Sequence, residues 1–311
     1  MEFSHIPVLL KETIEGLDIK ENGIYVDCTL GGGGHSLEIL KKLGPEGRLV
    51  AIDQDEKALV AAQKRLFEYK DQIYFVKSNF AYLESILDSL DIDKVDGVLM
   101  DIGVSSYQLD EKERGFSYHQ DAVLDMRMDK SQELTAKYVV NNYSKEELEN
   151  IFWNYGEEKW GRRIAEFIIA EREDKEIIST LELVDIIKKA IPKKVRMQGK
   201  HPAKRVFQAL RIEVNKELDV LESTLGIAVD RLKLDGRLAV ITFHSIEDRI
   251  VKTRFIELEK GCTCPPEFPI CVCNKKQEIK IINRKPITAS KKELDNNRRA
   301  KSAKLRICKK I

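Results

Sequence analysis

Short apolar runs alternate with helical patterns through the first hundred residues of this 311-residue chain. Four runs have the length and composition of buried strands, and they cover residues 24–28, 49–52, 73–76 and 95–100. Between them, apolar residues at helical spacing predict helices over about 36–43, 55–69 and 82–90. Because strands that alternate with helices form βαβ units, the pattern predicts a mostly parallel sheet.

The next hundred residues have a different pattern. No strand of this kind appears from about Asp110 to Ile212, where helices are expected at 145–152, around 160–168, and at 181–190 with Thr180 as the cap. The helical pattern resumes after Arg205 and runs to about Leu234, with a break expected at Gly226. Further elements are expected at 238–242 (strand), 246–259 (helix, capped by Ser245 with Asp248) and 278–282 (last strand).

The return of a strand after the helical region indicates an insertion, because a separate C-terminal domain would not restore the α/β pattern. The sequence therefore predicts a discontinuous α/β core at residues 1–109 and 213–311. Residues 110–212 are predicted to form an inserted helical domain that recognises the substrate.

Four consecutive glycines, Gly31–Gly34, follow the first strand, and Asp53 ends the second. Glycines allow positive φ and let a ligand lie against peptide N–H groups, while an acid at the end of the second strand can bind ribose hydroxyls. This predicts an adenosine-type cofactor at the carboxyl edge of the sheet. A dinucleotide site would have G-x-G-x-x-G, but the sixth position from Gly31 is Ser36, and no phosphate-loop Lys-Ser/Thr pair follows. The pattern thus favours a cofactor without phosphates, such as S-adenosylmethionine, over a dinucleotide.

Basic charge is segregated along the chain, although the net charge is only +1. Residues 275–311 hold 14 Lys/Arg against 3 Asp/Glu, and residues 188–211 hold nine Lys/Arg and no acid. Such segregation is typical of polyanion binders, and the alternative is a solvated face with a basic tail. No run approaches the ~18 apolar residues of a membrane span, and the first residues lack a signal-peptide pattern. We therefore expect a cytoplasmic protein with no membrane partner.

Four cysteines lie within twelve residues, at positions Cys262, Cys264, Cys271 and Cys273. Four thiols at this spacing could surround one tetrahedral zinc ion. However, C-x-C is less diagnostic than C-x-x-C, and the prolines between the two pairs indicate a surface loop. A structural zinc site and a reduced loop with redox-sensitive thiols both remain open, and the pattern gives these thiols no catalytic role.

Several short motifs follow one another in a specific order, at residues 5–10, 31–36, 101–110, 114–117, 125–129, 201–205, 207–212, 243–249 and 299–306. Among them are Asp101-Ile-Gly-Val-Ser-Ser-Tyr-Gln108-Leu-Asp, His201-Pro-Ala-Lys-Arg and Phe243-His-Ser-Ile-Glu-Asp-Arg. In this order they resemble the bacterial small-subunit (16S) ribosomal RNA cytosine-N4 methyltransferase family over nearly the whole chain. Two features depart from the family pattern: Ala122-Val123 replaces an expected Gly-Pro, and the cysteine tetrad is not a general family feature.

The resemblance implies a Rossmann-like class I methyltransferase core with an inserted helical domain, S-adenosylmethionine as the cofactor, and 16S rRNA in the small ribosomal subunit as the partner. It also implies roles for seven residues: Gly33, Gly34 and His35 at the methionine portion, Asp53 at the ribose, Phe80 near the adenine, and Asp101 and Gln108 on the methyl-donor side. For three of them a structural role is the alternative, namely core packing for Phe80, helix capping for His35, and an exposed loop position for Gln108.

The chemistry that the resemblance implies suits these residues. Methylation at cytosine C5 would need a cysteine nucleophile, usually in a Pro-Cys dipeptide, and the sequence contains none. Methylation of the exocyclic amine needs no covalent intermediate, and a carboxylate such as Asp101 can stabilise the charge that develops on the amine. His244 is the next candidate for this role. The Asp/Asn/Ser-Pro-Pro-aromatic motif of many amino-methyltransferases is absent, so the N4 position follows from the resemblance alone.

Two other functions compete with cytosine-N4 methylation of ribosomal RNA. A methyltransferase of the same fold could act on a protein or a small molecule, and it would not need the basic tail. A non-catalytic ribosome-assembly factor could bind RNA and use the cofactor only structurally. The sequence leaves the oligomeric state open.

Overall fold

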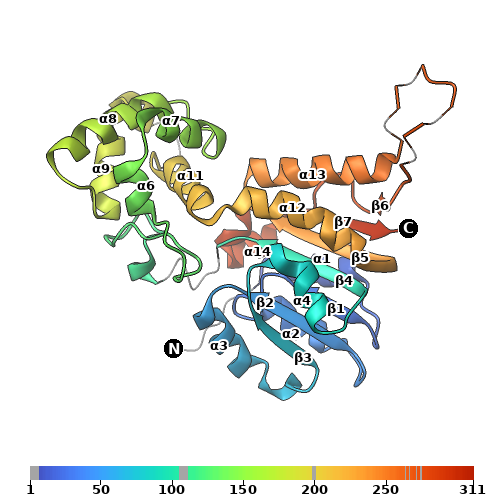
Figure 1. Ribbon diagram of the computed structural model, residues 1–311. Coiled ribbons are helices and arrows are strands. Elements are labelled where there is room, and N and C mark those ends of the chain that lie inside the picture. Colours follow the sequence, from blue (N-terminus) through green and yellow to red (C-terminus); the bar gives the residue numbers. More distant parts are fainter. Residues whose placement is uncertain are drawn as a thin grey trace. The chain divides into compact units, whose positions relative to one another are not determined.

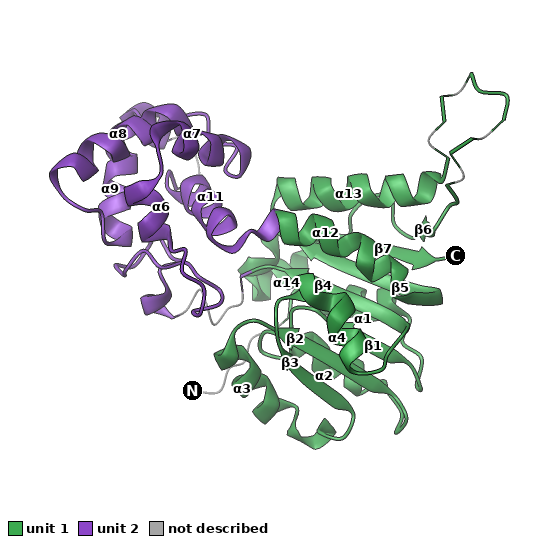
Figure 2. Ribbon diagram, in the orientation of Figure 1, with its two compact units in different colours: residues 1–103, 219–311 green, residues 104–218 purple. Residues whose placement is uncertain are grey.

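A computed structural model describes residues 7–104, 111–197, 201–262, 264–265, 267–270, 272–273 and 275–311. The chain forms two compact units, one of residues 1–103 and 219–311 and one of residues 104–218 (Figure 2). The helical unit thus lies between two parts of the α/β unit along the sequence, with breaks at 103 and 219 where the sequence had suggested 109 and 213. Within the described residues, no helix is both long and apolar enough to cross a membrane.

The α/β unit contains a seven-stranded sheet with the order β3-β2-β1-β4-β5-β7-β6 (Figure 1). Its strands are β1 (Ile24–Asp27), β2 (Arg48–Asp53), β3 (Ile73–Lys77), β4 (Val95–Ile102), β5 (Leu232–Thr242), β6 (Ile279–Ile281) and β7 (Lys304–Lys310). The first five strands pair in parallel, whereas β7 is antiparallel to both β5 and β6. The predicted parallel βαβ series and Rossmann-like fold class are confirmed.

Alternate residues of each strand enter two separate hydrophobic cores, one on each face of the sheet. One face packs against α4 (Leu83–Ser89), α12 (Glu217–Asp230) and α13 (Ser245–Lys260). The other face packs against α1 (Leu10–Leu17), α2 (Gly34–Leu40) and α3 (Glu56–Arg65), and Leu294 of α14 (Lys291–Asn296) packs against the same core. In β2, for example, Val50 and Ile52 face the first core, and Leu49 and Ala51 face the second. Burial on both faces explains why these strands are continuous apolar runs.

The helical unit has a hydrophobic core of its own. Its helices are α6 (Ala136–Asn142), α7 (Lys145–Asn154), α8 (Gly161–Asp174), α9 (Thr180–Ala190), α10 (Lys193–Arg196) and α11 (Lys204–Asn215). The expected helices near 145–152, 160–168 and 181–190 correspond to α7, α8 and α9. Ile164 and Ile168 of α8 are fully buried in this core, and Trp160 and Phe167 pack against it. Short 3-10 turns η1 (Phe67–Tyr69), η2 (Phe80–Tyr82), η3 (Lys112–Arg114) and η4 (Arg298–Ser302) complete the elements.

Three helix boundaries differ from the sequence-based predictions. Ser179, not Thr180, caps α9, because its side chain accepts the N–H of Glu182 in a capping box, while the Thr180 hydroxyl donates to the carbonyl of Gln120. His244 rather than Ser245 caps α13, in a capping box with Glu247. The break between α11 and α12 falls at Lys216, which has a φ of 52°, and α12 continues through Gly226.

The sequence pattern predicts 278–282 as the last strand and does not reveal β7. Strand β7 pairs with β5 along six residues and separates β5 from β6. Its basic side chains are neutralised by acids from elsewhere in the chain. Asp248 of α13 accepts hydrogen bonds from Arg306 Nε at 2.6 Å and from Lys304 Nζ at 2.8 Å. These two hydrogen bonds join α13 to β7.

We predict that Asp248→Asn destabilises the protein at pH 7. Burial alone would raise the pKa of Asp248, but the hydrogen bonds from Arg306 and Lys304 outweigh it and lower the pKa. The ionised carboxylate therefore stabilises the fold above the unfolded-state pKa of about 3.9, and this contribution is lost as the pH falls through the lowered folded-state pKa. Urea unfolding should show a loss of about 2–3 kcal/mol at pH 7, and the loss should shrink in acid.

The matched control is Asp235→Asn, which removes an exposed partner of Lys309 on the neighbouring strand β5. Exposed ion pairs contribute little, so this variant should unfold close to the parent. An equal effect of the two substitutions would contradict the role assigned to Asp248.

Candidate functional site

The turn between β1 and α2 holds its backbone in conformations that favour glycine. Gly31 has a φ of 50° and Gly33 a φ of 70°. A Cβ on Gly34 would lie 2.3 Å from Pro7 Cγ, whereas a Cβ on Gly32 would meet nothing within 4 Å. The turn is therefore closely packed against the protein at Gly34 and open at Gly32. An open backbone surface of this kind can accept a ligand next to peptide groups.

Asp53 at the end of β2 is tied to this turn. Its Oδ2 accepts the N–H of Gly31 at 2.8 Å, and its Oδ1 accepts the N–H of Asp55 at 2.8 Å. Burial raises the pKa of Asp53 to about 6, and these two N–H groups oppose that rise. Each carboxylate oxygen can accept a second hydrogen bond. The partly exposed Asp53 can thus receive two hydroxyl donors, as the sugar of an adenosine would offer.

Asp101 at the end of β4 lies across β1 from Asp53 in the sheet order. Its backbone N–H donates to Thr29 Oγ1 at 2.7 Å, and its Oδ2 lies 3.8 Å from His35 Nδ1. Its Oδ1 is buried and has no hydrogen-bond partner among the described residues, although the side chain as a whole is 24 % exposed. Burial raises the pKa of Asp101 to about 8, with further contributions from the charges of Asp27 and Glu247. An unpaired buried oxygen is costly, so a donor or cation from a ligand would be favourable here.

Two acids at this edge were not identified from the sequence. Asp27, which ends β1, is 1 % exposed, and its carboxylate accepts the Ser36 hydroxyl at 2.7 Å and the Thr29 N–H at 3.1 Å. Glu247 is fully buried, and its Oε2 accepts the N–H groups of Phe243 and His244. Asp27 carried a usable signal, because it ends the first strand directly before the glycines. The sequence gives no signal that Glu247 lies at this edge, since only the fold brings α13 there.

His35 lies in the first turn of α2 and is 6 % exposed. Its Nε2 lies 3.0 Å from the carbonyl oxygen of Val8, which can only accept, so Nε2 carries the proton. This bond fixes the ring with Nδ1 towards Asp101. His35 is therefore oriented by Val8, and the predicted contact with the methionine portion stays a prediction.

Phe80 begins η2, is half-buried, and packs against the core that contains α4 and α12. Its segment is adjacent to Asp53, because the Ser78 N–H donates to the Asp53 carbonyl at 3.0 Å. Gln108 lies outside the described residues. The structure thus brings Gly33, Gly34, His35, Asp53 and Asp101 around the end of β1, and Phe80 lies two residues beyond Ser78, which is bonded to Asp53.

His244, the second candidate for the role of Asp101, is occupied as a helix cap. Its Nδ1 accepts the N–H of Glu247 at 3.4 Å, and its Nε2 lies 2.9 Å from Glu247 Oε1. His244 is thus the N-cap of α13, and its predicted role at the substrate stays a prediction.

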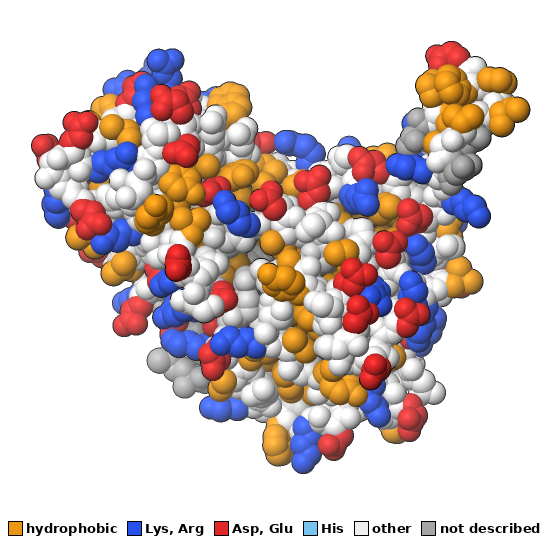
Figure 3. Space-filling view, viewed as in Figure 1, with side chains coloured by type: hydrophobic (Ala, Val, Ile, Leu, Met, Phe, Trp, Pro, Cys, Tyr) orange, Lys and Arg blue, Asp and Glu red, His pale blue; other side chains and the backbone are white. Residues whose placement is uncertain are grey.

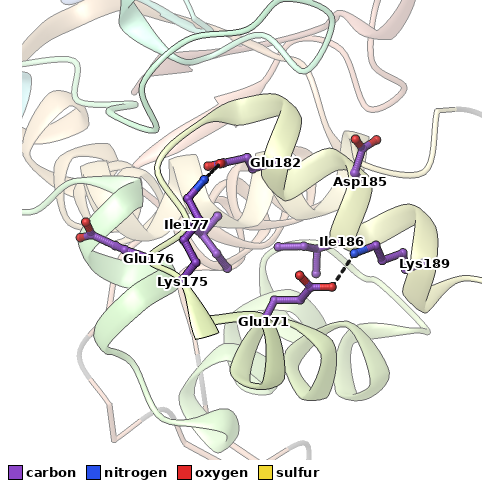
Figure 4. Close-up of a pocket in the computed structure, with 8 residues that line it drawn as sticks. All are labelled: Glu171, Lys175, Glu176, Ile177, Glu182, Asp185, Ile186 and Lys189. Atoms are coloured by element: carbon purple, nitrogen blue, oxygen red, sulfur yellow. Dashed lines mark hydrogen bonds and ion pairs between the residues drawn. The ribbon is translucent and has the colours of Figure 1, made fainter. Parts of the chain in front are cut away.

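A separate pocket of about 210 Å3 lies in the helical unit, between α8 and α9 (Figure 4). Its lining carries four acidic side chains and two lysines, namely Glu171, Glu176, Glu182, Asp185, Lys175 and Lys189. Both lysines are engaged in ion pairs, Lys175 with Glu182 at 2.6 Å and Lys189 with Glu171 at 2.5 Å. Glu176 and Asp185 are paired with Lys137 and Lys188, at 3.0 Å each, so each of the four acids in this lining has a lysine partner.

A parallel sheet with a reversed β7, a glycine turn after β1, and carboxylates at the ends of β2 and β4 define the class as a Rossmann-like methyltransferase. More specifically, the chain belongs to the MraW methylase family, whose sequence model matches residues 2–311. It is 62 % identical over 311 residues to a "Ribosomal RNA small subunit methyltransferase H" of Clostridium botulinum (strain 657 / Type Ba4), with complete coverage of both chains. A protein of the same name from Finegoldia magna is 60 % identical, again with complete coverage.

We predict that Asp101→Asn stabilises the ligand-free protein at high pH. The folded-state pKa of about 8 exceeds the unfolded-state value of about 3.9, so the folded state binds the proton more tightly. Stability from this group is fully present below pH 4 and is lost as the pH rises through 8. Asparagine cannot ionise and does not lose this stability. The melting temperature of the variant minus that of the parent should therefore be larger at pH 8.5 than at pH 5.

The control is Asp93→Asn, at a side chain that is 86 % exposed. Its melting temperature should equal that of the parent at pH 5 and at pH 8.5. A difference between Asp101→Asn and the parent that does not change with pH would show that the carboxyl titrates normally.

Proposed function

We propose that this protein transfers the methyl group of S-adenosylmethionine to the N4 amine of a cytosine in the decoding region of small-subunit (16S) ribosomal RNA. The observation that carries the proposal is the full-length identity of 60–62 % to proteins named ribosomal RNA small subunit methyltransferase H. The choice of N4 and of the decoding region rests on the motif resemblance. An enzyme acting on ribosomal subunits would work in the cytoplasm.

The residues at the carboxyl edge of the sheet fit the proposed cofactor. Asp53 has free acceptor capacity for ribose hydroxyls, and the glycine turn offers open backbone at Gly32. Phe80 lies two residues beyond Ser78, whose N–H donates to the Asp53 carbonyl, and it is the aromatic side chain proposed for the adenine. When bound, S-adenosylmethionine supplies a methyl group on a positively charged sulfonium. A cation of this kind would stabilise the buried Oδ1 of Asp101, which has no hydrogen-bond partner among the described residues. Gln108 remains a proposed contact on the same side.

In this proposal Asp101 also acts on the substrate amine. The N4 lone pair is delocalised into the cytosine ring, so the amine gains positive charge as its bond to the methyl carbon forms. The carboxylate of Asp101 stabilises that charge through the amino protons, and Oδ1 accepts the proton that the methylated amine must lose. Burial raises the pKa of Asp101 to about 8, so the positive charge of a bound sulfonium would favour the ionised form that accepts the proton. The charges of Asp27 and Glu247 add to the same field.

The helical unit offers flat rings for an unstacked base. Tyr118 and His201 are partly exposed and stack with ring centroids 4.7 Å apart and an interplanar angle of 15°, while the buried Phe207 meets Tyr118 edge-on at 5.6 Å from the core side. Sequence-specific RNA binding commonly uses such rings to hold bases that have left the helix. We assign substrate recognition to this unit on that basis.

The direct test compares rRNA nucleosides from cells with and without the gene by mass spectrometry. N4-methylcytidine at one decoding-region position should disappear with the gene and return with the purified protein, S-adenosylmethionine and small subunits. Loss of a different methylated nucleoside would overturn the N4 assignment. Unchanged rRNA with methylation of a protein, or delayed subunit assembly without any methylation, would favour one of the two competing functions.

Two variants should separate cofactor binding from methyl transfer. Asp53→Ala removes a charged acceptor from the ribose, so its affinity for S-adenosylmethionine should fall roughly tenfold or more by calorimetry, in line with about 1.5–3 kcal/mol per charged hydrogen bond. Asp101→Asn keeps the shape of the side chain, so turnover should fall far more than affinity. Turnover within a few-fold of the parent would exclude Asp101 as the group that stabilises the amine.

The basic surface is smaller than the composition indicates, because part of it serves the fold. Ion pairs with acids occupy these cations: Arg284, Lys304, Arg306, Lys309 and Lys310 in the tail, and Lys188, Lys189 and Arg211 in the earlier stretch. Exposed cations of the tail include Lys291, Lys292, Arg298 and Arg299, on α14 and η4. We propose this second set as the surface that binds rRNA phosphates.

Replacing Lys291, Lys292, Arg298 and Arg299 by glutamine should weaken binding to small subunits and flatten its salt dependence. Each lost phosphate contact should reduce the slope of log affinity against log salt by about 0.7 for single-stranded RNA. The control replaces Lys309 and Lys310, which are paired with Asp235 and Glu278, and it should keep the parental slope. Equal slopes for all three proteins would move the RNA surface away from α14 and η4.

A further inference from the structure

A long loop joins α13 to β6 in the α/β unit and projects from it (Figure 1). Its described residues between Lys260 and Ile279 form no helix or strand. The base of the loop is closed, since the N–H of Glu278 donates to the carbonyl of Leu258 at 3.0 Å. Gly261, with a φ of 66°, lies so close to the returning chain that a Cβ there would be 2.7 Å from the nitrogen of Gln277.

Hydrophobic burial does not hold this loop together. Phe268, Ile270 and Val272 are 51 %, 75 % and 66 % exposed, and Figure 3 shows apolar side chains gathered on the projecting segment. Loops longer than about 12–15 residues without secondary structure are uncommon, and they are usually functional or linker segments. Small segments that lack a core are often ordered by a bound metal or by disulfides.

Three thiols converge in this loop. The Sγ atoms of Cys262, Cys264 and Cys273 all lie within 4.8 Å of one another, and each residue is partly buried. The Sγ atoms of Cys262 and Cys273 are 3.8 Å apart, well beyond a disulfide bond of about 2.05 Å. In a tetrahedral site with Zn–S bonds of about 2.3 Å, neighbouring sulfurs lie about 3.8 Å apart. The observed separation therefore matches sulfurs that share a metal ion.

A backbone contact adds an independent indication. The N–H of Val272 donates to Cys264 Sγ at 3.3 Å. A backbone N–H that donates to a ligating sulfur holds that ligand in place, as the groups around metal ligands commonly do. Thiolates are the form in which cysteine binds metals.

We propose that Cys262, Cys264 and Cys273 bind a structural zinc ion that orders the loop between α13 and β6. Thiolate ligands select zinc over magnesium or calcium, and zinc sites of this kind stabilise small segments without a core. Structural zinc is four-coordinate. The sequence offers Cys271 for the fourth position, and this residue lies outside the described part of the structure. The site is distinct from the glycine turn and carries no step of methyl transfer.

The test measures metal in the full-length protein after expression with zinc and desalting under reducing conditions. Mass spectrometry of the metal should give about one zinc per chain, and X-ray absorption should show sulfur ligands at about 2.3 Å. Changing Cys262, Cys264 and Cys273 to serine should lower the zinc content roughly tenfold or more. The matched control is Cys308→Ala, at a buried thiol of β7, which should keep its zinc.

Limited proteolysis gives a readout that does not depend on the variants. Removing zinc from the parent with a chelator should expose residues 262–275 to cleavage, and adding zinc back should restore protection. The proposal is overturned if the reduced parent binds no zinc, if iron or copper occupies the thiols instead, or if the serine variant keeps its zinc.

Discussion

Negative charge gathered at one edge of the sheet is the constraint on which the rest of the site depends. Asp27 and Asp53 end β1 and β2, Asp101 is the last residue but one of the neighbouring β4, and Glu247 comes from α13. Burying such groups together is costly, as the raised pKa values of Asp53 and Asp101 reflect. The fold compensates most of them with backbone N–H and hydroxyl donors from the glycine turn, from Ser36 and from the start of α13.

Asp101 is the member of this group whose compensation is incomplete. In the glycine turn, the N–H of Gly31 donates to the carboxylate of Asp53. The Thr29 hydroxyl oxygen, in contrast, accepts the backbone N–H of Asp101 and makes no hydrogen bond to Oδ1 of the Asp101 carboxylate. One oxygen is thus left for a molecule from outside. The same arrangement favours a positively charged ligand over a dinucleotide, whose phosphates would add to the repulsion. A preference for a positively charged cofactor over a phosphate-bearing one agrees with the absence of a phosphate-binding motif in the sequence.

Much of the α/β unit could be predicted from the sequence because its strands are buried on both faces and end in acids or glycines. The positions of Asp53 and Asp101 followed from that pattern. The strand β7 could not be recognised in the same way, since Lys304, Arg306 and Lys309 find their acids far away in the sequence. The cap of α13 was misplaced because Ser245 with Asp248 and His244 with Glu247 have the same spacing. At α9, Thr180 is a good cap residue by type, but only Ser179 has a glutamate three positions on. The influence of Asp27 and Glu247 on Asp101 depends on packing, which spacing alone does not encode.

The placement of β7 also sets the order in which the sheet can be completed. Along the chain β6 precedes β7, but in the sheet β6 pairs with β7 alone, and β7 occupies the edge of β5. During synthesis β6 therefore has no strand to join until residues 304–310 have emerged, and β5 meanwhile presents an unpaired edge. Unpaired edges are templates for aggregation. A nascent chain of this protein thus passes through a vulnerable interval that ends only when its most basic segment enters the interior of the sheet.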